Sequence, residues 1–188
     1  QWLSEFHPSS LNPHPSLVAW LTLDSHDNRD GRFLSYLVAA LQEADRAIGT
    51  EAARLLASAQ YVSPEVILTS LVNDLDGAGG ETVLVLDNYQ FAASPAIHES
   101  VAFLLEHCPQ TCHLVIATRS EPPLPLARLR ARGQVVELRA ADLAFTEAEA
   151  RQFLDEVMGC QLGPQAVAAL DERTEGWIAG LQMAALSM

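Results

Sequence analysis

The segment Thr82–Gln90, with the sequence TVLVLDNYQ, constrains the fold of this chain more than any other stretch. Its first five residues, Thr82 to Leu86, favour a β-strand and show no alternation of polar and apolar positions. Such a run is typical of a parallel sheet whose two faces are covered by helices. Asp87 follows at the expected end of the strand, where ligands bind in open α/β sheets. Asp87 is therefore a candidate to hold a metal or orient a water, although an Asp at this point can also simply start a turn.

Strand-like and helix-like patterns alternate along the first 143 residues. Strand-like apolar runs occur at residues 17–23, 82–86, 113–118 and 134–138. Helical patterns occur at residues 32–41, 51–59, 64–75, 95–107 and 126–132. This alternation predicts an α/β fold with a parallel sheet and helices on both faces. After Leu143 only helices are expected, the first with a capping box at Thr146 and Glu149. We therefore predict an α/β core at 1–143 and a small all-α subdomain at 144–188.

The chain is acidic and contains no lysine. Its formal net charge is -13, and all 11 basic residues are arginines. An acidic surface repels the nucleic-acid backbone, so this segment is not expected to bind DNA itself. The phosphate-binding loop G-x-x-x-x-G-K-[ST] needs a lysine, so these residues cannot supply that loop. The apolar runs are too short to cross a bilayer and no leader-like start is present, so we expect a cytoplasmic protein without membrane contact.

One cluster has the composition of a metal-ligand set: His107, Cys108, Cys112 and His113. Cys112 and His113 are neighbours entering an expected strand, so their side chains should point to opposite faces of the sheet. A closed structural metal site is therefore not expected there. Together with Cys160 the cysteines are too few for a disulfide framework, which fits a reducing compartment.

Two further groups of residues have a structural and a functional interpretation. Trp177 begins an apolar stripe at helical spacing, so we expect it in a hydrophobic core and not in contact with a ligand. Arg128, Arg130 and Arg132 lie on a short helix expected to stop at Gly133. There they complement the negative end of the helix dipole. Contact with a nucleotide on a neighbouring subunit is the alternative for these arginines.

The order of the motifs resembles a known family. The segments LVLDNYQ, LVIATRSEPPLPLARLRARG, FTEAEARQFL and ERTEGWIAGLQMAALSM follow one another in this order. They resemble the nucleotide-binding domain of MalT-like, large LuxR-type transcriptional activators, which are STAND-class signal-transduction ATPases within the P-loop NTPases. The resemblance extends from VAWLTLD to the last helix. It implies a P-loop NTPase-type parallel sheet, incomplete in this chain, followed by a helical lid-type subdomain.

The resemblance also implies a function and a site. A regulator of this family is switched by ATP and ADP with Mg²⁺, self-associates in its active form, and binds DNA through a downstream domain that this sequence does not include. Asp87 would correspond to the Mg²⁺-associated carboxylate, and Arg119 to the arginine that contacts the terminal phosphate. For Arg119, a surface ion pair with Glu121 is the alternative.

Three departures from the family pattern limit what can be transferred. The phosphate-binding loop and the strand before it are expected upstream of Gln1, so the fragment alone is not expected to hold a nucleotide. Asn88 stands where a second acid is usual, and because an amide cannot act as a general base, we assign no catalytic residue and expect no hydrolysis. Gln90 stands where a histidine is usual. Without the upstream strand we expect about four strands in a distorted order, or an aggregation-prone fragment.

Three functions remain open from the sequence. The leading hypothesis is a fragment of a nucleotide-dependent regulator of transcription that does not itself hydrolyse ATP. The alternative is a nucleotide-independent oligomerisation or protein-interaction module on a degenerate NTPase fold, which Asn88, Gln90 and the missing lysine favour. A metal-dependent hydrolase built from Asp24, Asp87 and His113 is the third, and only strand-end geometry supports it.

Overall fold

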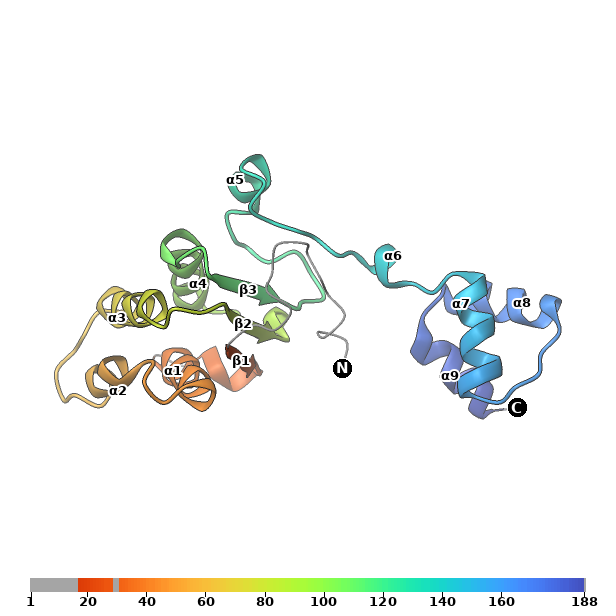
Figure 1. The fold of residues 1–188 in the computed structure, drawn as a ribbon, viewed down its shortest axis with the longest axis horizontal. Helices are drawn as coiled ribbons and strands as arrows, with labels where there is room; N and C mark the ends of the chain where they lie inside the picture. The colour runs from red at the N-terminus through yellow and green to blue at the C-terminus, as the bar shows by residue number, and fades with distance from the viewer. Residues whose placement is uncertain (1–16, 29–30, 188) are drawn as a thin grey trace. The chain divides into compact units, whose positions relative to one another are not determined.

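The computed structural model describes residues 17–28 and 31–187, which form two compact units (Figure 1). The first unit ends at Leu126 and combines a parallel sheet with helices, and the second begins at Ala127 and is helical. This architecture confirms the α/β class followed by an all-α part. The boundary expected at 143/144 lies within the second unit, which also contains most of α5 (Leu126–Ala131) and all of α6 (Ala140–Leu143).

The sheet contains three parallel strands in the order β1-β2-β3. Strand β1 (Leu17–Thr22) pairs with β2 (Thr82–Asp87), and β2 pairs with β3 (Cys112–Ile116). All three strands were predicted from their apolar runs. Thr22 lies beside Asp87, and Leu86 lies beside Ile116, so the three strands end at the same edge of the sheet.

Helices follow each of the first two strands. They are η2 (Ser25–Asn28), α1 (Arg32–Ala44), α2 (Thr50–Leu56), α3 (Pro64–Gly77), η3 (Tyr89–Phe91) and α4 (Pro95–His107). The expected α-helices are confirmed to within a few residues at their ends. Leu37 of α1, Leu71 of α3 and Val101 of α4 are fully buried and share one core with Leu84 and Leu86 of β2.

In the described residues one face of the sheet packs against this helical core, whereas helices were expected on both faces. On the opposite face Trp20 is 50% exposed, and Val18 and Val115 are exposed as well. The strand order explains the difference. Right-handed crossovers between successive neighbouring strands place all the connecting helices on the same side of a sheet.

The prediction of a strand at residues 134–138 is wrong, because the described part of the chain has no strand after β3. Val136 is 81% exposed, and Glu137 binds Arg130 at 2.6 Å and Arg139 at 3.1 Å. We expected about four strands in a distorted order. The described residues instead form three strands in regular order. An apolar run becomes a strand only where a neighbouring backbone satisfies its hydrogen bonds, and the sequence does not reveal whether such a neighbour is present.

The helical unit has its own small core. It is built from α7 (Glu147–Gln152), the π-helical turn η4 (Phe153–Val157), α8 (Pro164–Thr174) and α9 (Ile178–Leu186). The fully buried side chains are those of Ala150, Leu154, Val167 and Leu181. The capping box is confirmed, because Thr146 Oγ1 accepts a hydrogen bond from Glu149 N and the Glu149 carboxylate accepts one from Thr146 N.

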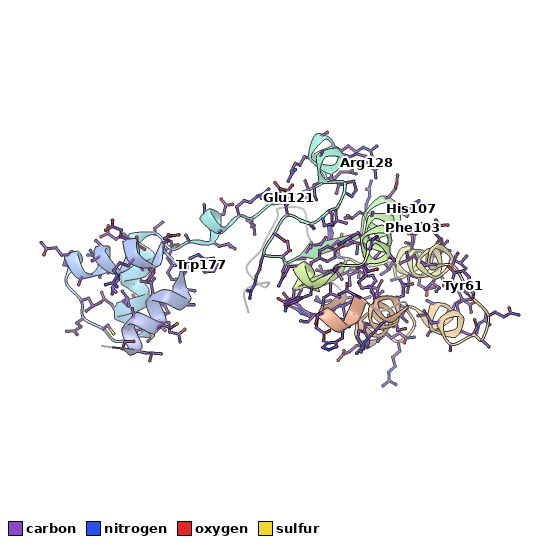
Figure 2. All side chains as sticks on the ribbon, turned by 180° about the vertical axis from the view of Figure 1, so that it is seen from behind. Tyr61, Phe103, His107, Glu121, Arg128 and Trp177 are labelled. Atoms are coloured by element: carbon purple, nitrogen blue, oxygen red, sulfur yellow. The ribbon has the colours of Figure 1, made fainter. Side chains whose placement is uncertain are left out.

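Trp177 does not belong to this core. Its side chain is 53% exposed (Figure 2), so the expectation that it packs inside is wrong. Helix α9 begins one residue later, and Leu181 and Ala185, one turn apart, form its buried side. Among the described residues, no helix is both long enough and apolar enough to traverse a lipid bilayer.

Candidate functional site

The carboxyl ends of the three strands meet at one edge of the sheet, which we call the strand-end edge. It comprises residues 23–28, 87–94 and 117–120. Backbone hydrogen bonds continue across it beyond the strands: Leu23 N donates to Asp87 O at 2.9 Å, and Tyr89 N donates to Ala117 O at 3.0 Å. In open α/β sheets this edge is where ligands bind. It is therefore the candidate site of this unit.

Asp87 is the last residue of β2 and is half-buried. Its Oδ1 accepts a hydrogen bond from Asn88 N at 2.8 Å. Asn88 adopts the left-handed conformation, with φ at 55°, which Asn tolerates better than most residues. A carboxylate offers about four acceptor positions, so this local bond leaves Asp87 able to coordinate a cation.

Arg119 lies on the next strand end, in the segment that follows β3, and its side chain is exposed. Its backbone N–H donates to Gln90 Oε1 at 3.3 Å, and a surface pair of its guanidinium with Glu121 stays the alternative to a phosphate contact. The structure thus brings Asp87 and Arg119 to the same edge on neighbouring strands. Their roles toward Mg²⁺ and phosphate remain predictions.

Gln90 connects these two strand ends. Its Nε2 donates to Asn88 Oδ1 at 3.2 Å, and its Oε1 accepts a hydrogen bond from Arg119 N at 3.3 Å. The sequence identified Gln90 only as a departure from a family pattern. Its partner Arg119 lies 29 residues away in the chain, so no local sequence pattern indicates this contact.

Asn28 makes the corresponding connection between the segments that follow β1 and β2. Its Oδ1 accepts hydrogen bonds from Ala93 N at 2.6 Å and Ser94 N at 3.0 Å, and its Nδ2 donates to Phe91 O at 2.9 Å. This residue was not singled out from the sequence. The available signal was an Asn in a polar segment directly after a strand, a position where side-chain amides commonly bind the backbone.

A buried acid stabilises the first segment of the edge. Asp27 is only 3% exposed, its Oδ2 accepts from Asp24 N at 2.7 Å, and its Oδ1 lies 3.6 Å from Arg32 Nε. Arg32 also donates to the Tyr36 hydroxyl at 2.6 Å. The hydrogen bond from the backbone N–H of His26 lowers the pKa of Asp24 below its ordinary value. These contacts hold the segment after β1 against the start of α1.

Tyr89 fixes the segment after β2 from beneath. Its ring is buried, and its hydroxyl lies 2.9 Å from Nδ1 of His98 on α4. Burial raises the pKa of Tyr89 and lowers that of His98. These shifts favour the neutral form of both groups, and their hydrogen bond fixes the turn that carries Asn88 and Gln90.

The hydrolase hypothesis built from Asp24, Asp87 and His113 is wrong. His113 pairs in register with Val83 near the amino ends of the strands, and its Nε2 lies 2.7 Å from Glu81 Oε2. Asp87 lies four residues further along β2 than Val83, which is about 13 Å along the strand. No group of three or more His, Cys, Asp or Glu side chains that could hold a metal occurs in the described residues.

The residues of the His and Cys cluster, where no closed metal site was expected, make other contacts. His107 stacks on Phe103 of the same helix with ring centroids 4.1 Å apart (Figure 2), and its Nδ1 lies 2.9 Å from Phe103 O. Contact with the Cys112 sulfur and burial raise the pKa of the Cys108 thiol. His113 is directed to Glu81 and not to these sulfurs.

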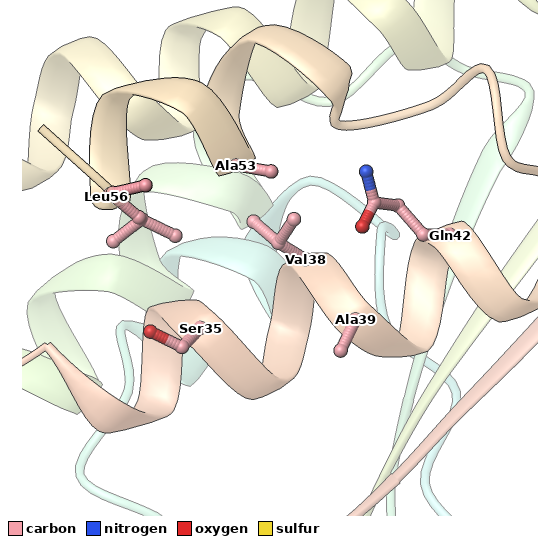
Figure 3. Close-up of a pocket in the computed structure, with 7 residues that line it drawn as sticks. Ser35, Val38, Ala39, Gln42, Ala53 and Leu56 are labelled. Carbon is pink, nitrogen blue, oxygen red and sulfur yellow. The ribbon is translucent and has the colours of Figure 1, made fainter.

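A shallow hollow of about 300 Å³ lies between α1 and α2 (Figure 3). It is lined by Ser35, Val38, Ala39, Gln42, Ala53, Leu56 and Ala57. No charged side chain and no residue of the strand-end edge takes part in this lining. The hollow therefore lacks the groups that would bind a phosphate or a metal.

The fold and the strand-end edge define an open α/β protein whose candidate site lies beyond the ends of parallel strands. Comparison with known proteins then gives a family resemblance. The chain is 36% identical over 170 residues to the HTH-type transcriptional regulator MalT of Serratia proteamaculans and to that of Yersinia enterocolitica. The MalT of Yersinia pestis is 36% identical over 172 residues. These alignments confirm the resemblance to MalT-like regulators.

The alignments cover 90% to 92% of this chain but 19% of each relative. The chain thus spans about a fifth of the length of the curated relatives it matches. No family model matches the chain.

Proposed function

We propose that this chain is part of a transcription regulator whose activity is switched by ATP and ADP. The observation that carries the proposal is the placement of Asp87 and Arg119 on neighbouring strand ends, at the edge where open α/β sheets bind ligands. The similarity to proteins named as MalT transcriptional regulators supports the regulatory part. Self-association and DNA binding through a separate domain belong to the same proposal.

The two side chains have the chemistry that a magnesium nucleotide requires. Asp87, half-buried and held by one hydrogen bond, would hold the Mg²⁺ of the nucleotide. The exposed guanidinium of Arg119 can donate two parallel hydrogen bonds to phosphate oxygens. Bound Mg²⁺ would supply positive charge against the phosphates. Asn88 cannot accept a proton as a carboxylate does, so this site binds nucleotide without an internal general base.

The test is nucleotide binding by the full-length protein. Isothermal titration with ATP and with ADP, each with and without Mg²⁺, should give Mg²⁺-dependent binding, and gel filtration with light scattering should show that ATP favours a larger assembly than ADP. Absence of nucleotide binding by a folded, monodisperse sample would refute the proposal.

The same experiment separates the second candidate, an interaction module that works without nucleotide. Asn88 and Gln90 at positions where the family carries an acid and a histidine favour this reading, as does the exposed apolar face with Val18 and Trp20. That module would self-associate to the same extent in ATP, in ADP and without nucleotide.

A further inference from the structure

Gln90 occupies the middle of the strand-end edge and makes one hydrogen bond to each side of it. Its amide donates to Asn88 Oδ1 on the β2 side and accepts from Arg119 N on the β3 side. Asn88 in turn donates its backbone N–H to the carboxylate of Asp87 at 2.8 Å. A continuous chain of three hydrogen bonds therefore joins Asp87 to the backbone of Arg119.

We infer that Gln90 is a positioning residue that makes the Asp87 carboxylate and the Arg119 segment move together when a nucleotide binds. The inference rests on the proposed function and assigns a residue to it beyond the two that the resemblance identifies. Gln90 touches neither Mg²⁺ nor phosphate in this account. It acts through Asn88 and through the backbone of Arg119.

The chemistry of the side chain fits this role. A primary amide provides a donor and an acceptor on one planar group, and the two bonds use one of each. A glutamate would keep the acceptor for Arg119 N but lose the donor to Asn88 Oδ1. A methionine of similar length would keep neither bond.

The surroundings hold the amide in place. The residue before it, Tyr89, is buried and hydrogen-bonded to His98, and the Tyr89 backbone N–H donates to Ala117 O. The turn that carries Gln90 is therefore fixed to α4 and to the end of β3. Because the backbone is held at both points, the amide can transmit a displacement of Arg119 to Asn88 without losing its position.

The first test needs no nucleotide. The test is hydrogen exchange of the Arg119 backbone amide, followed by NMR in the 188-residue chain. The exchange rate in Gln90→Glu should equal that of the wild type, because the bond to Arg119 N is kept. In Gln90→Met the exchange should be about fivefold or more faster than in the wild type. Gln110→Met is the matched control, because Gln110 is exposed before β3 at the opposite end of the strand. An Arg119 amide that exchanges equally fast in the wild type and in Gln90→Met overturns the inference.

The second test uses the full-length protein and the ratio of its affinities for ATP and ADP. Gln90→Met and Gln90→Glu should each bring this ratio about tenfold closer to one, since both uncouple the arginine from the carboxylate. Gln110→Met should leave it unchanged. A ratio within twofold of wild type in both Gln90 variants overturns the inference while the proposed function stands. A wild-type protein that binds neither nucleotide overturns both.

Discussion

Replacing Asn28 should destabilise the sheet unit through the loss of hydrogen bonds between two distant segments. The Asn28 amide donates to Ser25 O at 3.1 Å and Phe91 O at 2.9 Å, and accepts from Ala93 N at 2.6 Å and Ser94 N at 3.0 Å. Each such bond contributes about 0.5–1.5 kcal/mol. Because the side chain is half-buried, water can take over some of the lost hydrogen bonds in the variant. We therefore expect Asn28→Ala to lower the free energy of unfolding by about 2–3 kcal/mol.

Asn28→Asp dissects this loss. The carboxylate keeps the two acceptor bonds but places negative charge against two carbonyl oxygens, so the variant should lose about 1–2 kcal/mol. Urea unfolding of the 188-residue chain followed by circular dichroism measures both values, and the slope with urea should not change. The matched control is Asn73→Asp, on the exposed side of α3, with a change of about 0.5 kcal/mol or less. A cost for Asn28→Ala no larger than for Asn73→Asp would refute the reasoning.

Two further predictions concern backbone geometry and pH. In Gly176→Ala the new Cβ would lie 2.6 Å from Phe145 O at a φ of +71°, whereas at Gly159, with φ +68°, a Cβ meets nothing within 4 Å. Thermal unfolding should show a loss of about 1–2 kcal/mol for Gly159→Ala and clearly more for Gly176→Ala, and equal losses would contradict the steric argument. Burial lowers the pKa of His98 below its ordinary 6.5, so the unfolded state binds more protons and stability should fall as pH drops from about 7 through 6. In His98→Asn the free energy of unfolding, measured with urea, should fall less between these pH values than in the wild type. An equal fall in both proteins would exclude His98 as a contributor.

The sequence was sufficient for the features that local patterns determine. The apolar runs that became β1, β2 and β3, the helical spacing from Phe33 to Leu41, and the capping box at Thr146 depend on residues close together in the chain. The ends of these strands also placed Asp87 and Arg119 on one edge, because parallel strands bring their carboxyl ends together.

The features that the sequence did not predict depend on residues far apart or on small shifts of phase. Residues 134–138 have the composition of a strand but no partner strand in the described chain. Trp177 precedes the first residue of α9 and has an extended backbone, so its exposed side chain does not continue the helical stripe. Asn28 reaches segments more than sixty residues away, and Gln90 binds a residue on another strand end, so no local pattern announces either contact.

The most direct test of the account compares Asp87→Asn and Arg119→Ala in the full-length protein by isothermal titration. If the two residues face a magnesium nucleotide, Asp87→Asn should remove the Mg²⁺ dependence of ATP binding. Arg119→Ala should weaken ATP by about 10- to 100-fold with little change for ADP. Arg173→Ala, an exposed arginine of the helical unit, is the control and should change neither. Wild-type affinities for both nucleotides in both variants would contradict the central claim.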